Sequence, residues 1–203
     1  MSALPKPYYT LEEYLELDRN SEERLEYWDG EIFSMSGASD QHDNIEANLI
    51  TYLNFRLGPK GCRTFTGNFR IKVPSLPPYR YGDTSALCGK PVFEKIGGVD
   101  TLTNPQLIIE ILSPSTKDYD LGPKFANYKS IPSFCEYLVI SQTTPHVIQF
   151  IRQLIKQGQN NWLKAEFTEL QDELELTSVG CQLSLAEIYQ YVIFPAGEDD
   201  DDE

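Results

Sequence analysis

The chain has 203 residues, which at about 100–200 residues per domain predicts one domain with a single sizeable core. Its 17 basic and 31 acidic residues give a formal net charge of −14, and removing the six acidic residues 198–203 leaves −8. These values exclude a broad basic surface, so nucleic acid would have to be bound through a local cleft or a bridging cation. No apolar stretch reaches the ~20 residues of a membrane span.

Residues 1–7 lack the apolar segment of a secretory signal, so we expect a cytoplasmic protein. The four cysteines are scattered without a C-x-x-C pair, which predicts small core residues rather than a disulfide framework or a zinc cage. Residues 1–196 are expected to form the single domain. Residues 197–203 are expected to be a disordered acidic tail, because the run of like charges repels itself.

The first third of the chain predicts a helix, a hairpin and a second helix. A T-x-x-E sequence beginning at Thr10 fits a capping box and indicates a short helix after it. Residues 24–28 and 31–36 are strand-like and are joined by an Asp-Gly pair, which is typical of a tight hairpin turn. Apolar residues at helical spacing then predict a helix over 41–57.

The middle of the chain reads mainly as strands. Residues 62–73 and 79–88 predict two strands, and residues 89–105 predict an irregular connection with two adjacent glycines. Residues 106–113 (QLIIEILS) are almost all apolar, as expected of a central strand covered on both faces.

The last part of the chain predicts a helix over roughly 121–131, with Asp120 as its N-cap and Pro123 in its first turn. The remaining expected elements are a strand over 136–140, a hairpin over 146–154 and 162–167, edge strands at 173–176 and 181–183, and a capped helix from 184 to about 192. This order indicates a mixed α/β (α+β) domain in which helices flank one central β-sheet.

Glu110 is the least expected residue of the central strand. It shares a strand face with Ile108 and Leu112, because side chains alternate between the two faces. A carboxylate buried among aliphatic side chains must raise its pKa, pair with a cation or bind a metal. Glu110 is therefore a candidate site residue, the alternatives being a structural salt bridge or a strand-end residue that reaches solvent.

Asp83 lies in the preceding strand-like segment among apolar and aromatic neighbours. If the two strands are adjacent, the carboxylates of Asp83 and Glu110 converge, and two such oxygens suit Mg²⁺. Lys124 enters the next helix within one turn and could reach back to this pair, while Lys117 is the rival candidate. Structural alternatives remain open for each, namely a turn aspartate and surface lysines.

Three segments of the sequence carry a family resemblance: residues 27–32 (YWDGEI), 109–116 (IEILSPST) and 120–128 (DLGPKFANY). With these segments the chain resembles the Uma2 family, also called DUF820, which is abundant in cyanobacteria and is placed in the PD-(D/E)XK nuclease superfamily. The resemblance extends over roughly residues 7–194. It implies a restriction-endonuclease-like core with an added N-terminal helix and β-hairpin.

The resemblance also implies roles for individual residues. Asp83 matches the aspartate of the PD element and Glu110 the acidic residue of (D/E)XK, which implies that both are catalytic and bind Mg²⁺ or Mn²⁺. The lysine of that motif should fall at Leu112, so the resemblance points instead to Lys124 as the catalytic lysine. Gly82 stands where the family usually has proline.

A further active-site residue is left open among Glu31, His42 and Glu46. The favoured hypothesis is a metal-dependent endonuclease that hydrolyses phosphodiester bonds in nucleic acid. DNA is the expected substrate, although the sequence does not distinguish DNA from RNA, and a homodimer would supply two sites for two strands. The alternative is a catalytically inactive nuclease-fold binding or scaffold module. The basic residues before Glu110 either line a local positive groove or are simply solvated; they are Arg63, Arg70, Lys72 and Arg80.

Overall fold

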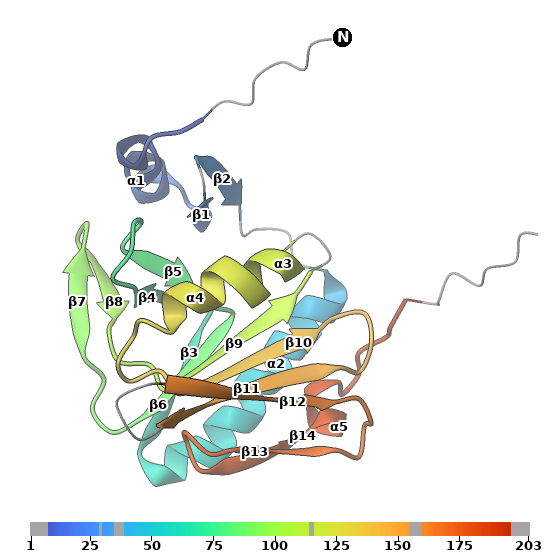
Figure 1. Cartoon of the computed structure of the whole chain (residues 1–203). Helices are drawn as coiled ribbons and strands as arrows, with labels where there is room; N and C mark the ends of the chain where they lie inside the picture. The colour runs from blue at the N-terminus through green and yellow to red at the C-terminus, as the bar shows by residue number, and fades with distance from the viewer. Residues whose placement is uncertain (1–7, 29, 35–38, 114–115, 155–159, 196–203) are drawn as a thin grey trace, which may run out of the picture.

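A computed structural model describes residues 8–28, 30–34, 39–113, 116–154 and 160–195, and it is built around a six-stranded sheet with helices on both faces (Figure 1). The strand order is β12-β11-β10-β9-β6-β3. Only β9 and β10 are parallel among these neighbouring pairs. The strands are β3 (Cys62–Thr66), β6 (Thr84–Cys88), β9 (Leu107–Leu112), β10 (Glu136–Ser141), β11 (Val147–Leu154) and β12 (Asn160–Phe167). The expected tail, 197–203, lies outside the described residues.

The N-terminal elements match the sequence prediction. Helix α1 (Leu11–Asn20) begins at the capping box of Thr10, and the hairpin pairs β1 (Leu25–Trp28) with β2 (Glu31–Ser34). Gly30 has φ +80°, which a glycine adopts without a Cβ clash, and its predicted turn partner Asp29 lies outside the described residues. Figure 1 shows the hairpin lying between α1 and α3 (Lys117–Tyr119).

Helix α2 (Asp40–Leu57) covers one face of the sheet, as the apolar spacing predicts. Ile45, Leu49, Leu53 and Leu57 are fully buried in a core with strands β9 and β10. The same core includes the hairpin β13 (Glu173–Leu176) and β14 (Cys181–Ser184) and the short helix α5 (Leu185–Ile188), and a 3₁₀ turn, η1 (Gly58–Lys60), follows α2. The Ser184 capping box forms, but the last helix ends earlier than predicted.

The opposite face is covered by a continuous helical segment made of α3 (Lys117–Tyr119), a π-helical turn η2 (Asp120–Lys124) and α4 (Phe125–Tyr128). Phe125 and Tyr128 pack on this side of the sheet. The predicted helix over 121–131 is therefore wrong at both ends, and Asp120 is a buried residue of the π turn rather than an N-cap. Pro123, which has no N–H to donate, lies in this widened turn.

The predicted strands 62–73 and 79–88 are each divided between two sheets. The second sheet has the order β5-β4-β8-β7 and consists of β4 (Arg70–Lys72), β5 (Tyr79–Tyr81), β7 (Phe93–Ile96) and β8 (Val99–Leu102). The expected irregular connection over 89–105 is thus wrong, because it contains the β7–β8 hairpin, which turns at two glycines with positive φ. The chain passes from one sheet to the other at Gly67 and at Gly82. Each of the two predicted strands is therefore interrupted at a glycine, although its sequence pattern is continuous.

Cys62 and Cys88 are direct partners across β3 and β6 and form a disulfide, which corrects the prediction of four independent core cysteines. Antiparallel pairing places these two residues together although they are 26 positions apart in sequence. Cys135 and Cys181 are free thiols. Within the described part of the chain, no helix is both long and apolar enough to cross a membrane.

Candidate active site

Glu110 points from β9 toward the α4 side of the sheet, on the same face as Ile108 and Leu112, as the alternation predicts. Its side chain is almost completely buried, with 2% of the residue exposed. The Tyr128 hydroxyl donates to Oε1 at 2.8 Å, and the Lys124 ammonium lies 3.0 Å from Oε2. The buried carboxylate therefore has one neutral donor and one cationic partner.

Asp83 lies between β5 and β6, where the chain enters the central sheet. Because β6 pairs antiparallel with β9, with Thr84 opposite Ile109, this position adjoins Glu110. The backbone N–H of Ile111 donates to Asp83 Oδ2 at 2.7 Å. Since a Cβ on the preceding Gly82 would stand 3.3 Å from Glu110 Oε1, glycine at that position leaves room for the second carboxylate.

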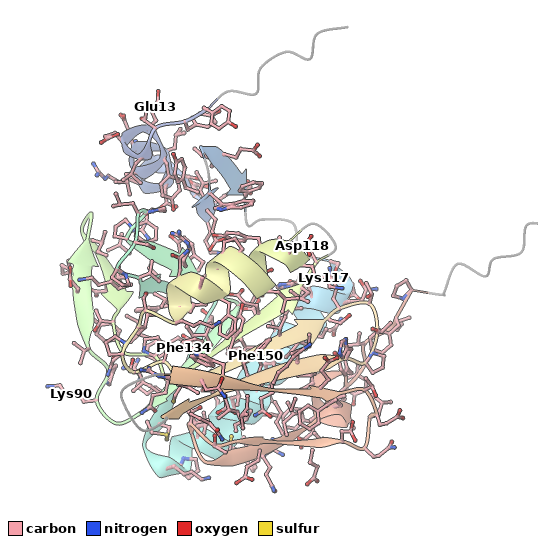
Figure 2. The ribbon with its side chains drawn as sticks, viewed as in Figure 1. Glu13, Lys90, Lys117, Asp118, Phe134 and Phe150 are labelled. Atoms are coloured by element: carbon pink, nitrogen blue, oxygen red, sulfur yellow. A yellow bond between two sulfur atoms is a disulfide. The ribbon has the colours of Figure 1, made fainter. Side chains whose placement is uncertain are left out.

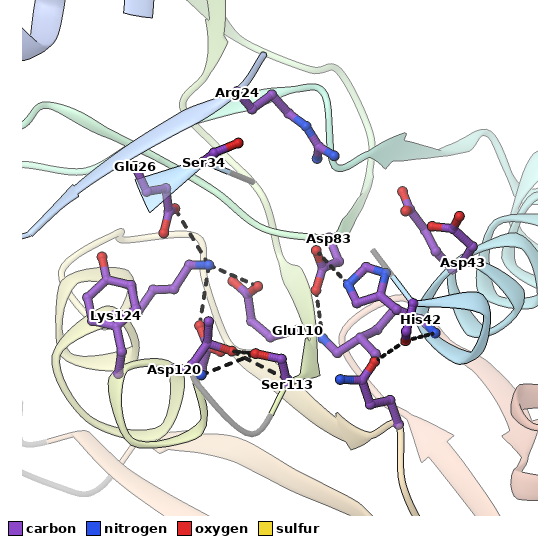
Figure 3. A pocket seen from close by; sticks show the side chains of 16 residues that line it. Arg24, Glu26, Ser34, His42, Asp43, Asp83, Glu110, Ser113, Asp120 and Lys124 are labelled. Atoms are coloured by element: carbon purple, nitrogen blue, oxygen red, sulfur yellow. Dashed lines mark hydrogen bonds and ion pairs between the residues drawn. The ribbon is translucent and has the colours of Figure 1, made fainter. Parts of the chain in front are cut away.

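Lys124 extends from the π turn into a group of carboxylates (Figure 3). Its Nζ atom lies 3.0 Å from Glu110 Oε2, 3.4 Å from Asp120 Oδ1 and 3.5 Å from Glu26 Oε1. The lysine is 1% exposed. One buried ammonium is thus shared by three carboxylates that come from β1, β9 and the π turn.

These groups line a cavity of about 350 Å³, which we call the acidic cavity. Its described lining includes six carboxylates but only two side chains that are permanently cationic, Arg24 and Lys124. The six carboxylates belong to Glu26, Asp43, Glu46, Asp83, Glu110 and Asp120. When all six are ionised, the cavity carries more negative charge than its described cationic side chains can neutralise.

The electrostatic consequences differ between the two central carboxyl groups. Burial raises the pKa of Glu110 well above its ordinary value, and the Lys124 charge offsets only part of this effect. The pKa of Asp83 is lowered instead: burial opposes ionisation, but the hydrogen bond and charge of His42 and the charge of Lys124 outweigh it. Asp83 is therefore the better ionised of the two.

The pKa values of the other titratable groups are set by the same two effects, burial and the charge of neighbouring groups. Burial raises the pKa of Asp120. Burial would lower the pKa of Lys124, but the surrounding carboxylates, Glu110 first, raise it well above its ordinary value. The pKa of His42 is also raised, since Asp83 outweighs the cost of burying the imidazolium. Lysine and histidine thus hold their protons as counterions of the carboxylates.

The structure brings Asp83, Glu110 and Lys124 together in one cavity, as the sequence hypothesis requires. Of the three residues left open, His42 lies 3.4 Å from Asp83 Oδ1 through its Nε2 atom, and Glu46 lines the cavity. Glu31 is not among the described lining residues. Lys117, the rival to Lys124, is exposed and lines a different cavity.

The positive groove proposed from the strands before Glu110 is not formed. Arg70 is buried and pairs with Asp18, and Arg80 is buried with its guanidinium donating to backbone carbonyl groups. Lys72 pairs with Glu94, while the exposed Arg63 lies over a phenylalanine ring. At least three of these cations are therefore engaged within the protein.

Sequence reasoning missed three buried members of the site. Glu26 has no sequence feature that marks it as a site residue, Asp120 is predicted as an N-cap, and Tyr128, one turn after Lys124, is typical of a packing residue. In the structure Glu26 accepts the Tyr81 backbone N–H at 3.0 Å and faces Lys124. The only sequence signal for Asp120 and Tyr128 is that they lie four residues before and after Lys124, which can place side chains on one helix face.

Comparisons with known proteins identify the relatives of this chain. The model of the Uma2 family, described as "Putative restriction endonuclease", matches residues 11–186. The chain belongs to the Uma2 family.

Two uncharacterized proteins of Synechocystis sp. (strain PCC 6803) are similar to this chain. Protein slr1290 is 32% identical over 190 residues, covering 94% of this chain and 96% of that protein. Protein sll1609 is 31% identical over 168 residues, covering 83% and 92%.

The Uma2 chain also shares its fold with a solved structure. A DUF820 protein from Anabaena variabilis ATCC 29413, whose crystal structure is described as that of a "putative nuclease", matches with a TM-score of 0.66. The match covers 91% of this chain and 99% of that one at 19% sequence identity. The expected nuclease-like α/β fold, with a central mixed sheet flanked by helices, is therefore confirmed, and the Uma2 description supports a nuclease at the level of the family.

Proposed function

We propose that this Uma2 protein is a metal-dependent endonuclease that hydrolyses phosphodiester bonds, with DNA as the first substrate to test. The observation that carries the proposal is the excess of buried carboxylates around a single buried lysine in the acidic cavity. Such an arrangement is costly unless the charge is compensated when the site works. The description of the Uma2 family supports the same reaction class.

The residues present fit a divalent cation. Asp83 and Glu110 would hold it, because each oxygen atom of a carboxylate can accept more than the single donor that the structure gives it. Both are hard oxygen ligands suited to Mg²⁺ or Mn²⁺. When bound, the cation would lower the pKa of a coordinated water and neutralise charge on the scissile phosphate.

Lys124 would hold the attacking water or a phosphate oxygen. Its ammonium donates a hydrogen bond to Glu110 at 3.0 Å, while the ion pairs with Asp120 and Glu26 at 3.4 and 3.5 Å hold it in position, so a further N–H can turn to an oxygen in the cavity. His42 would keep Asp83 ionised and oriented from the opposite side, since its Nε2 atom lies beside Oδ1. The cation would also bridge an acidic protein to a polyanion, which a chain of net charge −14 otherwise repels.

Cleavage assays test the proposal directly. The protein is incubated with supercoiled plasmid, a single-stranded DNA and a single-stranded RNA, in Mg²⁺, Mn²⁺ or EDTA. We expect cleavage only with a divalent cation, and loss of cleavage in Asp83→Asn and Glu110→Gln. Cleavage that is equal in EDTA, or unchanged in both variants, would overturn the proposal.

The same assays address the inactive scaffold alternative and the homodimer. A protein that binds DNA in a metal-dependent way without cutting it would match the scaffold hypothesis, to which Leu112 at the usual lysine position points. Double-strand cleavage in one binding event requires two sites, so sedimentation of the active form tests whether a dimer supplies them.

A further inference from the structure

A second cavity of about 420 Å³ adjoins the acidic cavity, and Ser113 lines both. It lies where β9 and β10 end and where α3 begins, with Leu112, Val139 and Ile148 contributing apolar surface. This volume falls within the ~300–1,000 Å³ typical of ligand pockets and is larger than the volume that a single small anion would occupy.

The lining of the second cavity has a composition that is unusual for this chain. None of its described lining residues is acidic, although the sequence has 31 acidic residues against 17 basic ones. The polar side chains are instead hydroxyl groups and two basic residues, Lys117 and His146; the hydroxyls belong to Ser113, Ser141, Thr143 and Thr144. His146 is paired with Glu166 at 3.0 Å, which leaves Lys117 as the cation without an ion pair among the described contacts.

We propose that the second cavity binds the nucleotide unit next to the bond cleaved in the acidic cavity, with the Lys117 ammonium against a phosphate oxygen. This inference rests on the proposed nuclease function. The apolar surface of Leu112, Val139 and Ile148 suits the carbon face of a sugar ring, while hydroxyl groups and an ammonium are the donors that phosphate oxygens accept. Because none of the described lining residues carries a carboxylate, the described part of the second cavity lacks the repulsion that the acidic cavity presents without its cation.

The chain offers a matched control for Lys117. Lys90 is also exposed and has no ion pair among the described contacts, and Figure 2 shows it on the opposite side of the molecule. Lys117→Ala and Lys90→Ala therefore remove the same charge from different places. Lys117→Arg keeps the charge and serves as the rescue variant.

The test combines binding and catalysis. Binding of a fluorescein-labelled 15-nucleotide single-stranded DNA is followed by anisotropy at several salt concentrations in Ca²⁺, an oxygen-binding cation that compensates the charge of the acidic cavity. We expect Lys117→Ala to weaken binding by about fivefold to tenfold and to reduce the slope of log affinity against log salt by about 0.7, as for one lost phosphate contact. Lys90→Ala and Lys117→Arg should stay within about twofold of the wild type.

Cleavage kinetics in Mn²⁺ with a long and a short substrate show whether Lys117 acts in substrate binding or at the cleaved bond. Lys117→Ala should raise KM for the 15-nucleotide substrate and leave kcat/KM unchanged for bis(p-nitrophenyl) phosphate, which has only the scissile phosphate. If Lys117→Ala matches Lys90→Ala, or lowers cleavage of both substrates equally, the inference is overturned while the proposed function stands. If the wild type cleaves neither substrate, the proposed function fails and the inference fails with it.

Discussion

Two buried clusters of charge in this molecule contain similar residues but differ in their balance. In the first, Asp18 of α1 pairs with Arg70, accepts a hydrogen bond from the Tyr79 hydroxyl at 2.6 Å, and accepts the Leu25 backbone N–H. Arg70 in turn donates to Tyr81 at 2.7 Å. One carboxylate faces one guanidinium, and the cluster holds α1 against the second sheet.

In the acidic cavity, by contrast, Lys124 pairs with three carboxylates, those of Glu26, Glu110 and Asp120, and Asp83 with its histidine lies beside them. Both clusters are buried, so burial of charge by itself does not indicate function. The Asp18–Arg70 pair, whose charges cancel, stabilises the fold. The excess carboxylates around Lys124 destabilise the folded state until a cation binds. Charge balance, rather than burial, therefore separates a structural cluster from a candidate active site.

The largest expected effect is on catalysis. Glu110→Gln should lower the rate of DNA cleavage by about 1,000-fold, because it removes a proposed ligand of the cation, whose contribution amounts to several kcal/mol of transition-state stabilisation. The free energy of unfolding in EDTA should not fall, since an amide replaces an unfavourable buried charge. Initial rates and urea denaturation measure the two quantities, with the exposed Glu173→Gln as control. A variant that loses activity only by unfolding would contradict the comparison.

The balanced cluster should respond in the opposite way. Asp18→Ala should lower the free energy of unfolding by about 3–5 kcal/mol, because it leaves the Arg70 guanidinium buried without its partner. This loss should be the same in EDTA and in Mn²⁺. Denaturant titrations under both conditions measure it, and a loss that Mn²⁺ restores would place Asp18 with the metal-binding groups.

The pH dependence of stability should also distinguish the clusters. The folded-state pKa values of Glu110, Asp120 and His42 lie above their ordinary values of 4.5, 3.8 and 6.5. Their contribution to stability is present in full below the unfolded-state values and is lost as pH rises through the folded-state values. The metal-free protein should therefore become less stable between about pH 5 and pH 8.

Glu110→Gln should flatten this pH dependence, whereas Glu173→Gln should leave it unchanged. Thermal unfolding in EDTA across this range provides the measurement. A wild-type curve that rises steadily from pH 5 to pH 8 would show that the buried carboxyl groups do not oppose folding.

The smallest effect is expected at the far end of the molecule. Glu187 closes the capping box of α5, where it accepts the Ser184 backbone N–H at 3.0 Å, and it pairs with Arg56 of α2. Glu187→Gln should cost about 0.5–1 kcal/mol and leave cleavage unchanged. Chemical denaturation and the plasmid assay check both parts, and a clear loss of cleavage would mean that the two ends of α2 are coupled.

The sequence was sufficient for the elements with a single strong pattern. The near-continuous apolar strand around Glu110, the apolar stripe of α2 and the Thr10 capping box all correspond to structural elements with nearly the predicted bounds. The breaks at Gly67 and Gly82 were not predicted. The segments before and after each glycine both have strand-like sequences, although they belong to different sheets. The local pattern of apolar and polar residues predicts a strand but does not indicate the sheet to which that strand belongs.

The candidate site divides in the same way. Glu110 was identifiable because its strand neighbours are apolar, and Asp83 and Lys124 followed from adjacent segments and from the family resemblance. Glu26 was not identifiable, since it reaches Lys124 only when the N-terminal hairpin docks on the domain. Asp120 was misread because the helix begins at Lys117, four residues earlier than an N-cap at Asp120 requires.

Binding of Mn²⁺ to the EDTA-stripped protein, measured by isothermal titration calorimetry, tests the central claim most directly. The account predicts that the wild type binds Mn²⁺, that Asp83→Asn and Glu110→Gln each weaken the affinity at least about tenfold, and that Asp18→Asn retains it. Absence of Mn²⁺ binding at millimolar concentrations, or equal affinity in all four proteins, would contradict the assignment of the acidic cavity as a cation site.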